Sequence, residues 1–445
     1  MIIDSILIVF RCIILVFSLF GYMQFVVNKT KIKADFAIGF VFSFIGIIMV
    51  FAGIFNILTE AIIILISLGS ILSAYALVKR MPVKTIMSPG VICFIVLSLA
   101  FVVIAYNSRT AHYDNFSHWA VVVKSMIING RFPNFIDADI ITFRDYPLGS
   151  ASFIYFISKV IGISSEWIWI YAQMILRLSF PICLFAFLPK DKFKSLLSAL
   201  VVAIACIAFS LYGIDHNDLL VDSILGVIAL YAFAFCFYYK ESIVEKVLPI
   251  TIVLTYLASV KHSGVLLVVM VFVYCLFNAR ADLLKKESIK QNLKYLYLVA
   301  MPLLSIYIWR CHVKLCFIDA ESRHSMSVNG MLGTFNSKTT ADHLATIKNF
   351  VIATLSNYNP FFICAWVMLG LFIIGFIKRK EHKYTNLMPL TVWCGVLYVI
   401  YSVSLGVMYL FSMPTAQESI ELVSYSRYIS TIIIVIVGIL VICTM

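Results

Sequence analysis

Long apolar blocks are the sequence feature that most limits how this chain can fold. A helix that crosses a bilayer needs about 20 mostly apolar residues. Thirteen stretches approach or reach that length: 5–27, 36–58, 60–78, 88–106, 166–188, 195–213, 223–239, 247–260, 264–278, 295–310, 359–377, 387–411 and 427–444. They predict an all-α fold, a polytopic transmembrane helix bundle of about 13 spans with two structured outer loops and juxtamembrane amphipathic helices.

The scarcity of charge excludes a soluble globular protein. Only 13% of the 445 residues are charged, whereas an ordinary soluble domain carries about 25%. The apolar residues form blocks rather than heptads, and the 11 cysteines are scattered, so a coiled coil and a disulfide scaffold are excluded too. The net charge of +12 reflects cations in the short connections, and we expect no nucleic-acid partner.

The placement of lysine and arginine predicts the topology. Six short connections, about 55 residues in all, hold 20 of the 34 cations and should face the cytoplasm. They are 28–35, 79–87, 189–194, 240–246, 279–294 and 378–386. The N-terminus then lies outside, as an uncleaved helix, and the C-terminus inside. The long connections 107–165 and 311–358 face outward. The pair 247–260 and 264–278 is short, and a re-entrant hairpin would give the same sidedness.

The first long connection contains a helical pattern followed by a second apolar stretch. After Asp114, apolar residues recur at three- and four-residue steps until Asn129-Gly130, which predicts a short amphipathic helix. The stretch from Ser150 to Ile163 is too short to span comfortably, and we expect it to lie flat on the membrane.

Asp114 and His118 are one helical turn apart in this connection, so they lie on the same side of the predicted helix. One interpretation is structural: Asp114 caps the helix, His118 is solvated and Trp119 belongs to the interfacial aromatic belt. The other is a site in which a carboxylate and an imidazole act together at the outer membrane face. The residues alone leave both open.

The surrounding motifs resemble a known family. Tyr113-Asp114-Asn115-Phe116-Ser117-His118-Trp119, then Asn129-Gly130, then Asp145-Tyr146-Pro147-Leu148-Gly149-Ser150 are similar to the first large outer loop of bacterial GT-C fold glycosyltransferases. The resemblance covers roughly 88–310. Such enzymes transfer a sugar from a polyprenyl-phosphate carrier to an acceptor outside the membrane, so it implies a multi-pass protein of the bacterial cytoplasmic membrane.

The resemblance also implies roles for individual residues. Asp114 takes the place of the family's acidic residue and is the expected base, with His118 orienting it or the acceptor. Trp119 and Tyr146 are expected substrate contacts. Two departures are visible: Asn115 replaces the second acid of the usual pair, and three further spans precede the usual first one. The domain division is then 1–87, a GT-C-like core at 88–310 with outer loop 107–165, the outer loop 311–358, and 359–445.

Cations at the outer side are candidates to hold the phosphate of the donor. Lys261 and His262 lie in a tight connection between two short apolar blocks, and Arg427 begins the last block. A charge between helices at the interface often serves a substrate, although a lysine can also extend to water at little cost. The Arg427 guanidinium suits a phosphate, and it equally suits Glu418 or Glu421.

Other polar residues allow several interpretations. The run from Asp215 to Asp218 with Asp222 could hold a divalent metal, and we favour a polar cap over short helices; no cofactor is otherwise indicated. Arg177 lies inside an apolar block, where it needs a partner such as a carrier phosphate. The connection 311–358, with Asp319, Glu321, Arg323 and His324, is expected to form a flap over the substrates.

Three rival functions remain. A polysaccharide repeat-unit polymerase or ligase would work on similar carriers, with Arg323 and His324 as its candidate residues. A secondary transporter would place ionisable residues near mid-bilayer, whereas most acids here lie at the expected outer edge. A structural scaffold is the third. The chain lacks both common nucleotide-binding glycine motifs, which suits a lipid-linked donor. The acceptor, whether glycan, lipid or protein, is not specified.

Overall fold

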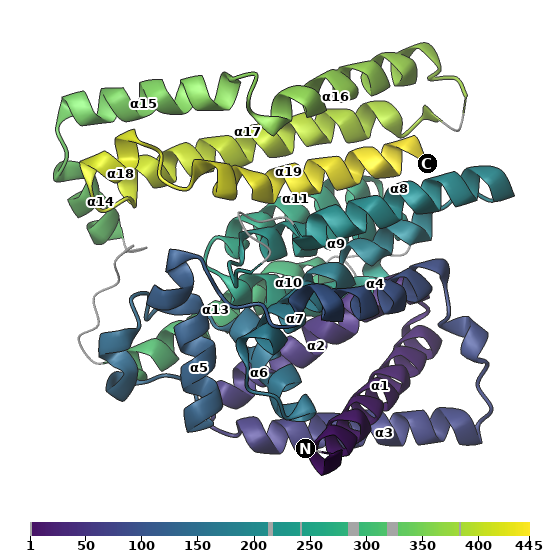
Figure 1. The fold of residues 1–445 in the computed structure, drawn as a ribbon. Coiled ribbons are helices and arrows are strands. Elements are labelled where there is room, and N and C mark those ends of the chain that lie inside the picture. Colours follow the sequence, from purple (N-terminus) through teal and green to yellow (C-terminus); the bar gives the residue numbers. More distant parts are fainter. Residues whose placement is uncertain (1, 212–216, 241–242, 284–292, 318–327, 382–383) are drawn as a thin grey trace. The chain divides into compact units, whose positions relative to one another are not determined.

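The computed structural model describes residues 2–211, 217–240, 243–283, 293–317, 328–381 and 384–445. The chain is 82% helical, and no strand occurs in those ranges, which confirms the all-α prediction. It forms two compact units, Met1–Ile318 and Asp319–Met445 (Figure 1). The boundary therefore falls within the long second connection rather than at either of its ends.

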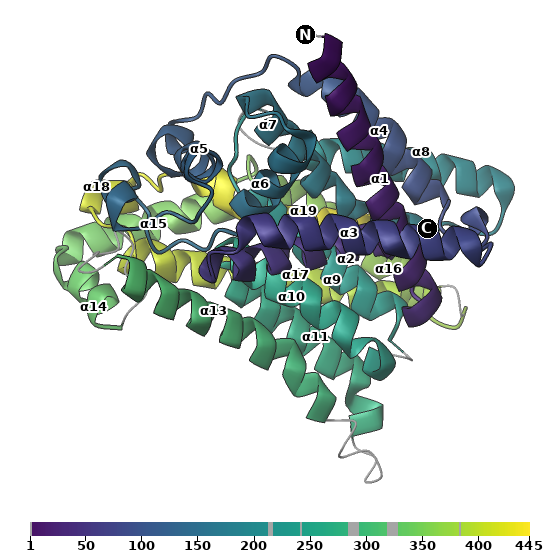
Figure 2. The ribbon, with the colours of Figure 1, turned by 90° about the horizontal axis from the view of Figure 1, so that it is seen from below.

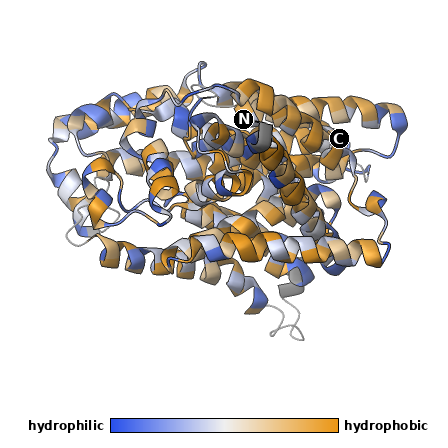
Figure 3. Ribbon diagram, turned by 60° about the horizontal axis from the view of Figure 1, so that its bottom comes forward, coloured by the Kyte–Doolittle hydropathy of each residue, from blue (hydrophilic) through white to orange (hydrophobic). Residues whose placement is uncertain are grey.

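Nine helical stretches of the described ranges are long and apolar enough to cross a membrane. They are α1 (Ile2–Thr30), α2 (Ala34–Ile54), α3 (Leu58–Val78), α7 (Glu166–Ser179) with η4 (Pro181–Phe187), α8 (Lys192–Leu211), η7 (Leu293–Leu296) with α13 (Tyr297–Cys316), α16 (Pro360–Ile377), α17 (Leu387–Phe411) and α19 (Tyr425–Thr444). The other four predicted blocks are also helices with shorter apolar parts: α4 (Pro89–Ala105), α9 (Asp222–Tyr238), α10 (Val247–Val260) and α11 (Gly264–Leu283). Hydrophobic residues dominate the long helices (Figure 3).

Helix α2 runs through the middle of the first unit, where it packs on α10, α6, η4 and α1 (Figure 2). Three glycines seven residues apart, Gly39, Gly46 and Gly53, make this close packing possible. Each is covered directly by an aromatic ring, from Tyr231, Tyr256 and Phe132 respectively, and an added Cβ would collide with that ring. A seven-residue step returns to nearly the same face of a helix, so the three glycines leave one face of α2 without side chains at these positions.

The connection 107–165 contains four short helices. The predicted helix after Asp114 is present as a π-helical turn, η2 (Asn115–Trp119), that continues into α5 (Ala120–Asn129). Gly130 ends α5 with φ of 67°, a left-handed conformation that glycine adopts without strain. A 3₁₀ helix, η3 (Phe135–Ile140), and then α6 (Gly149–Ile161) follow.

Helix α6 differs from the expected surface helix. Every residue of α6 except Lys159 is buried, and the helix packs on α2, α7, α5 and α1. The expectation that this stretch lies flat on the membrane is therefore wrong. The physical reason is that small serines and Gly149 accompany the apolar residues, so the helix has almost no polar face to keep in water.

The second unit comprises α14 (Val328–Asn336), α15 (Thr340–Leu355), α16, α17, α18 (Ala416–Ile420) and α19. Lys338, between α14 and α15, donates to the carbonyl of Leu410 and to Ser419 Oγ, which satisfies acceptors at the end of α17. The described part of the expected flap 311–358 is thus mostly helical. Asp319, Glu321, Arg323 and His324 lie outside the described residues.

Candidate functional site

Three segments of the first unit bring polar side chains together around one buried imidazole. They are the start of η2, the turn before α6 and the connection between α10 and α11. We call the group that they form the His118 cluster: Asp114, His118, Asp145, Tyr146, Lys261 and His262. Long stretches of chain separate the three segments, so only the tertiary fold unites them.

The His118 side chain is the centre of the cluster. It is fully buried, and its ring packs edge to face against Trp119, Tyr146 and Phe143, with ring centroids 4.7, 5.4 and 5.7 Å away. Neither ring nitrogen has a hydrogen-bond partner among the described residues. The expectation of a solvated histidine, part of the structural interpretation, is therefore wrong. A buried polar group without a partner is costly, and such groups often mark functional sites.

Electrostatics keep this imidazole neutral. Burial lowers the pKa of His118 to about 3, because an imidazolium ion would lose its hydration. Asp145 and Asp114 favour the charged form, but burial, to which the positive charge of Lys261 adds, outweighs them. A neutral imidazole offers one donor and one acceptor at neutral pH. A hydroxyl group could use either.

Asp114 lies at the N-cap position of η2, yet its side chain does not cap the helix. Its backbone N–H donates to His112 Nδ1 at 3.1 Å, and its carbonyl accepts a hydrogen bond from Ser117. Asp114 is half-buried. The capping function that the structural interpretation assigned to this carboxylate is therefore wrong.

The connection between α10 and α11 is tied to two neighbouring segments. Lys261 Nζ lies 2.9 Å from Asp222 Oδ1 at the start of α9, and both side chains are nearly buried. His262 Nε2 lies 3.5 Å from Asp145 Oδ2. Trp309 Nε1 of α13 also donates to the Asp145 carbonyl at 2.7 Å. The turn before α6 is therefore held both by α13 and by the connection between α10 and α11.

Tyr146 links the histidine to the lysine. Its ring packs on His118, lies 5.9 Å from the Trp119 ring, and has Lys261 Nζ 5.9 Å from its centroid. Six of the seven sequence-predicted residues are thus brought together: Asp114, His118, Trp119, Tyr146, Lys261 and His262. Trp119 is buried, so it does not belong to an exposed aromatic belt.

A fully buried ion pair, Arg177 with Asp218, fixes the segment before α9, which is hydrogen-bonded to η2. Arg177 Nη2 donates to Asp218 Oδ1 at 3.0 Å and to the Leu220 carbonyl at 2.9 Å. Asp218 Oδ1 also accepts the Leu220 N–H. The partner that a charge inside an apolar block requires is therefore Asp218, and a carrier phosphate is not needed to explain Arg177.

Asn115, which replaces the second acid of the family's pair, has a structural contact. Its Oδ1 accepts the Leu219 N–H at 3.0 Å, and the residue is fully buried. This bond ties η2 to the segment that Arg177 holds. An amide makes it without adding a second negative charge beside Asp114, which explains why a neutral residue fits here.

The described residues do not fit a metal site. No group of three or more His, Cys, Asp or Glu side chains gathers in the ranges that the structure describes. Asp218 and Asp222 pair with Arg177 and Lys261, as expected of a polar cap. Asp215 and His216 lie outside the described residues. Cys311 and Cys316 lie in the last turns of α13 as free thiols.

Arg427 belongs to the second unit. It lies in the first turn of α19, where its guanidinium lies 5.0 Å from the centroid of the Tyr428 ring and donates to the Tyr428 hydroxyl. Its part in a phosphate site with Lys261 stays a prediction.

Sequence reasoning gave no role to Asp145, which the structure places against His262. The sequence feature that could have identified Asp145 is the run Asp145-Tyr146-Pro147, in which an acidic residue precedes an aromatic residue and a proline that restricts the backbone. Asp222 was considered as a metal ligand or as part of a polar cap, and its pairing with Lys261 depends on a contact between distant segments. Comparisons with protein-family models, with curated proteins and with solved structures return no match.

Proposed function

We propose that this protein is a membrane glycosyltransferase that moves a sugar from a polyprenyl-phosphate-linked donor to an acceptor at the outer face of the bacterial cytoplasmic membrane. The single observation that carries the proposal is the His118 cluster. It places acidic, imidazole and cationic side chains around one buried ring, beside helices apolar enough to lie in lipid. A lipid-linked donor needs such a position, because its head group is polar and its tail is not.

The reaction assigns Asp114 the task of base. An acceptor hydroxyl attacks the anomeric carbon, a new carbon–oxygen bond forms, and the bond from that carbon to the phosphate oxygen breaks. The hydroxyl proton passes to Asp114, and the polyprenyl phosphate leaves with the bonding electrons. Asp114 is a half-buried member of the cluster, so a substrate can approach this residue.

His118 acts as a positioning residue in this scheme. It remains neutral at physiological pH and offers a hydrogen bond to the acceptor hydroxyl or to the substrate sugar. A protonated imidazole would repel the positive charge that develops on the sugar ring in the transition state. Burial of the ring is therefore consistent with its proposed task.

Lys261 is the proposed ligand of the leaving phosphate. In the structure it pairs with Asp222, and its side chain retains 12% exposure. A phosphate carries more negative charge than a carboxylate and would share this ammonium group. His262 lies next to it, and Arg427 is the proposed third ligand.

The proposal includes thirteen crossings of the membrane, with the N-terminus outside and the C-terminus inside.

A secondary transporter is the second candidate, and the buried ion pair of Arg177 and Asp218 is the observation that bears on it. Ionisable residues buried among membrane helices are common on transport pathways. Here the pair is fully enclosed and also binds the Leu220 backbone, which is the pattern of a structural support. A polymerase or ligase that uses Arg323 and His324 is the other alternative.

The test uses purified protein in lipid nanodiscs with radiolabelled short-chain prenyl-phosphate hexoses and pentoses, and a mixed set of glycan, lipid and peptide acceptors. We expect sugar transfer that falls at least a hundredfold in Asp114→Asn. Asp191→Asn is the matched control, because Asp191 is an exposed aspartate outside the cluster whose capping bond an asparagine can keep.

Three results would refute the proposal. One is transfer that Asp114→Asn leaves intact. Another is solute flux into vesicles without any sugar-lipid donor. The third is cysteine labelling that places residue 114 on the cytoplasmic side. Loss of transfer in Arg323→Ala or His324→Ala, with Asp114→Ala active, would favour the polymerase.

A further inference from the structure

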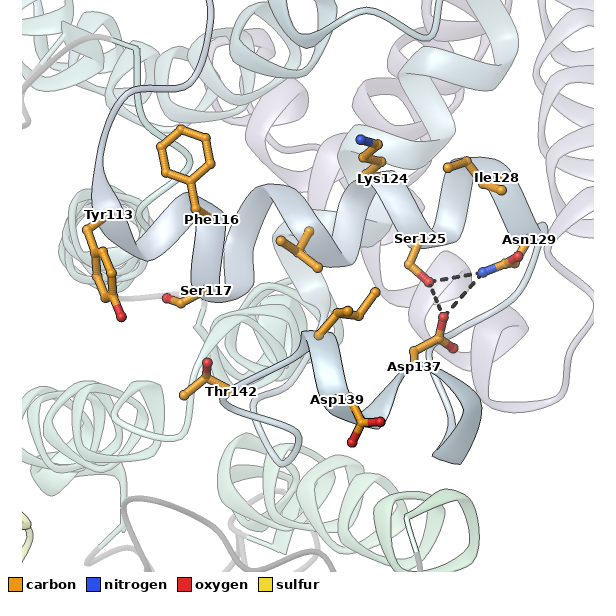
Figure 4. A pocket seen from close by; sticks show the side chains of 12 residues that line it. Tyr113, Phe116, Ser117, Lys124, Ser125, Ile128, Asn129, Asp137, Asp139 and Thr142 are labelled. Carbon is orange, nitrogen blue, oxygen red and sulfur yellow. Dashed lines mark hydrogen bonds between the residues drawn. The ribbon is translucent and has the colours of Figure 1, made fainter.

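A pocket of about 660 Å³ opens along one side of η2 and α5, and its lining includes Tyr113 and Phe116, which flank the proposed base in the sequence. One wall is the helical segment from Tyr113 to Asn129, and the facing wall contains Asp139 and Thr142 (Figure 4). Its volume lies in the range of about 300–1,000 Å³ that is usual for small-molecule sites. Nothing in the proposed chemistry so far uses this pocket.

The frame of the pocket is fixed by internal bonds. Asp137 accepts hydrogen bonds from Ser125 and Asn129 (Figure 4). It also forms an ion pair with Arg131 at 2.8 Å. Burial alone would raise the pKa of Asp137, but the bonds from Arg131, the Asn134 backbone and Ser125 outweigh it and hold that pKa below its usual value. At the other end, the Thr142 N–H donates to the Ser117 carbonyl at 3.0 Å.

The lining alternates apolar faces with polar groups. Tyr113 and Phe116 are 73% and 62% exposed, so each presents an uncovered aromatic face at the pocket. Ser117 and Thr142 supply hydroxyls. Asp139 and Lys124 supply charges of opposite sign, and the charge of Asp137, which also lines the pocket, is balanced by Arg131. The charged groups thus cancel, which disfavours a phosphate or a strongly charged peptide. The hydroxyls and the carboxylate disfavour a lipid tail.

We propose that this pocket binds the acceptor of the transfer reaction and that the acceptor is a neutral saccharide. Sugar rings have apolar C–H faces that pack on aromatic rings, and hydroxyl edges that pair with carboxylates and hydroxyls. Tyr113 and Phe116 flank Asp114 and Asn115 in the sequence, so a saccharide lying on these rings ends beside the proposed base. The inference rests on the proposed function, and it names the acceptor class that sequence reasoning left open.

Binding is measured separately from transfer. Saturation-transfer NMR and titration would use the full-length protein in nanodiscs with three probes: trisaccharides of glucose, of galactose and of N-acetylglucosamine. We expect at least one to bind, and Phe116→Ala and Asp139→Asn each to weaken it at least tenfold. Phe135→Ala is the matched control, because Phe135 is an exposed aromatic of the same connection outside the pocket lining. Asp114→Asn should bind normally.

The outcomes separate this inference from the proposed function. Binding that the pocket variants weaken, without any transfer by the wild-type protein, supports the pocket and removes the glycosyltransferase proposal. Transfer that Phe116→Ala and Asp139→Asn leave unchanged overturns the pocket and keeps the enzyme. Failure of all three trisaccharides to bind below 10 mM, or equal binding by all variants, also overturns the pocket. Both pocket residues are exposed, so we expect their variants to fold normally.

Discussion

Lys261 Nζ lies 2.9 Å from Asp222 Oδ1, and this pair joins the turn between α10 and α11 to the start of α9. The lysine therefore has a partner before any substrate arrives, and its two possible tasks can be separated by experiment. If Lys261 only stabilises the fold, its replacement lowers the stability of the protein and donor binding together. If Lys261 binds the donor phosphate, its replacement lowers chiefly the rate of sugar transfer.

Lys261→Gln should lower kcat/KM for the prenyl-phosphate sugar about a hundredfold, because a hydrogen bond to a charged group contributes about 1.5–3 kcal/mol. Asp222→Asn keeps a hydrogen-bond acceptor and leaves the cation in place, so we expect activity within about threefold of wild type. Steady-state kinetics and thermal unfolding in detergent measure the two effects. Equal losses of stability in both variants, with an unchanged kcat/KM in Lys261→Gln, would assign the lysine to the scaffold.

Arg177 and Asp218 provide the sharpest stability prediction. Both side chains are fully buried, and Arg177→Met leaves the Asp218 carboxylate without its cation. We expect a loss of about 3–5 kcal/mol in the free energy of unfolding, which is typical when one member of a buried pair is removed. The double variant Arg177→Met/Asp218→Asn should recover much of it, since no charge is stranded. Lys194→Met, an exposed cation, is the control. Denaturant unfolding measures the wild type, these three variants and Asp218→Asn, and a loss in the double variant equal to the sum of the losses in its two single variants would contradict the coupling.

Much of the fold was predictable because lipid imposes a simple rule on sequence. Each apolar block is a helix, and the end of α5 at Asn129 followed from Gly130, whose left-handed conformation only a few residue types adopt easily. The prediction for the start of the same helix was less accurate. Its first turn is π-helical, and that turn places His118 inside the protein rather than in water.

Most members of the candidate site were predictable, whereas Asp145 and the contacts among the members were not. Sequence spacing put Asp114 and His118 on one side of a helix, and the motif drew attention to Tyr146. The pairing of His262 with Asp145, and of Lys261 with Asp222, joins segments that no local pattern relates. The burial of α6 likewise depends on four neighbouring helices, so its short apolar stretch was mistaken for a surface helix.

The lowered pKa of His118 leads us to expect that the stability of the protein depends on pH. The unfolded histidine binds a proton near pH 6.5, whereas the folded imidazole stays neutral until about pH 3. Between these values the unfolded state binds more protons, so stability is complete above about pH 6.5 and falls as the pH decreases toward 3, by up to about 1.4 kcal/mol per pH unit. His118→Phe keeps an aromatic ring and should flatten this part of the curve. His343→Phe, in the second unit, is the control. Unfolding free energies at pH 7, 6 and 5 make the comparison, and an equal slope in His118→Phe would contradict the assignment.

Gly46 tests the packing of α2. An added methyl group collides with the Tyr256 ring, so Gly46→Ala should destabilise the protein by about 1–3 kcal/mol, the usual effect of overpacking. Gly370→Ala meets open space within α16 and should be neutral or slightly stabilising, since alanine favours helix. Replacing Tyr256 with leucine in the Gly46→Ala background should restore part of the loss. Thermal unfolding distinguishes the three, and equal melting temperatures of Gly46→Ala and Gly370→Ala would contradict the close contact.

Asn115 allows the departure from the family's acid pair to be tested directly. Asn115→Asp retains an oxygen that accepts the Leu219 N–H, so η2 should stay in place. It also adds a buried carboxylate beside Asp114, and like charges raise each other's pKa. We therefore expect the acidic limb of the pH–rate profile to move to higher pH in Asn115→Asp. Asn115→Ala instead leaves the Leu219 N–H without its partner, which costs about 1–3 kcal/mol of stability without a shift of that limb. An unchanged profile in Asn115→Asp would mean that Asp114 is not the base, and Asp145, the other carboxylate of the cluster, would be the next candidate.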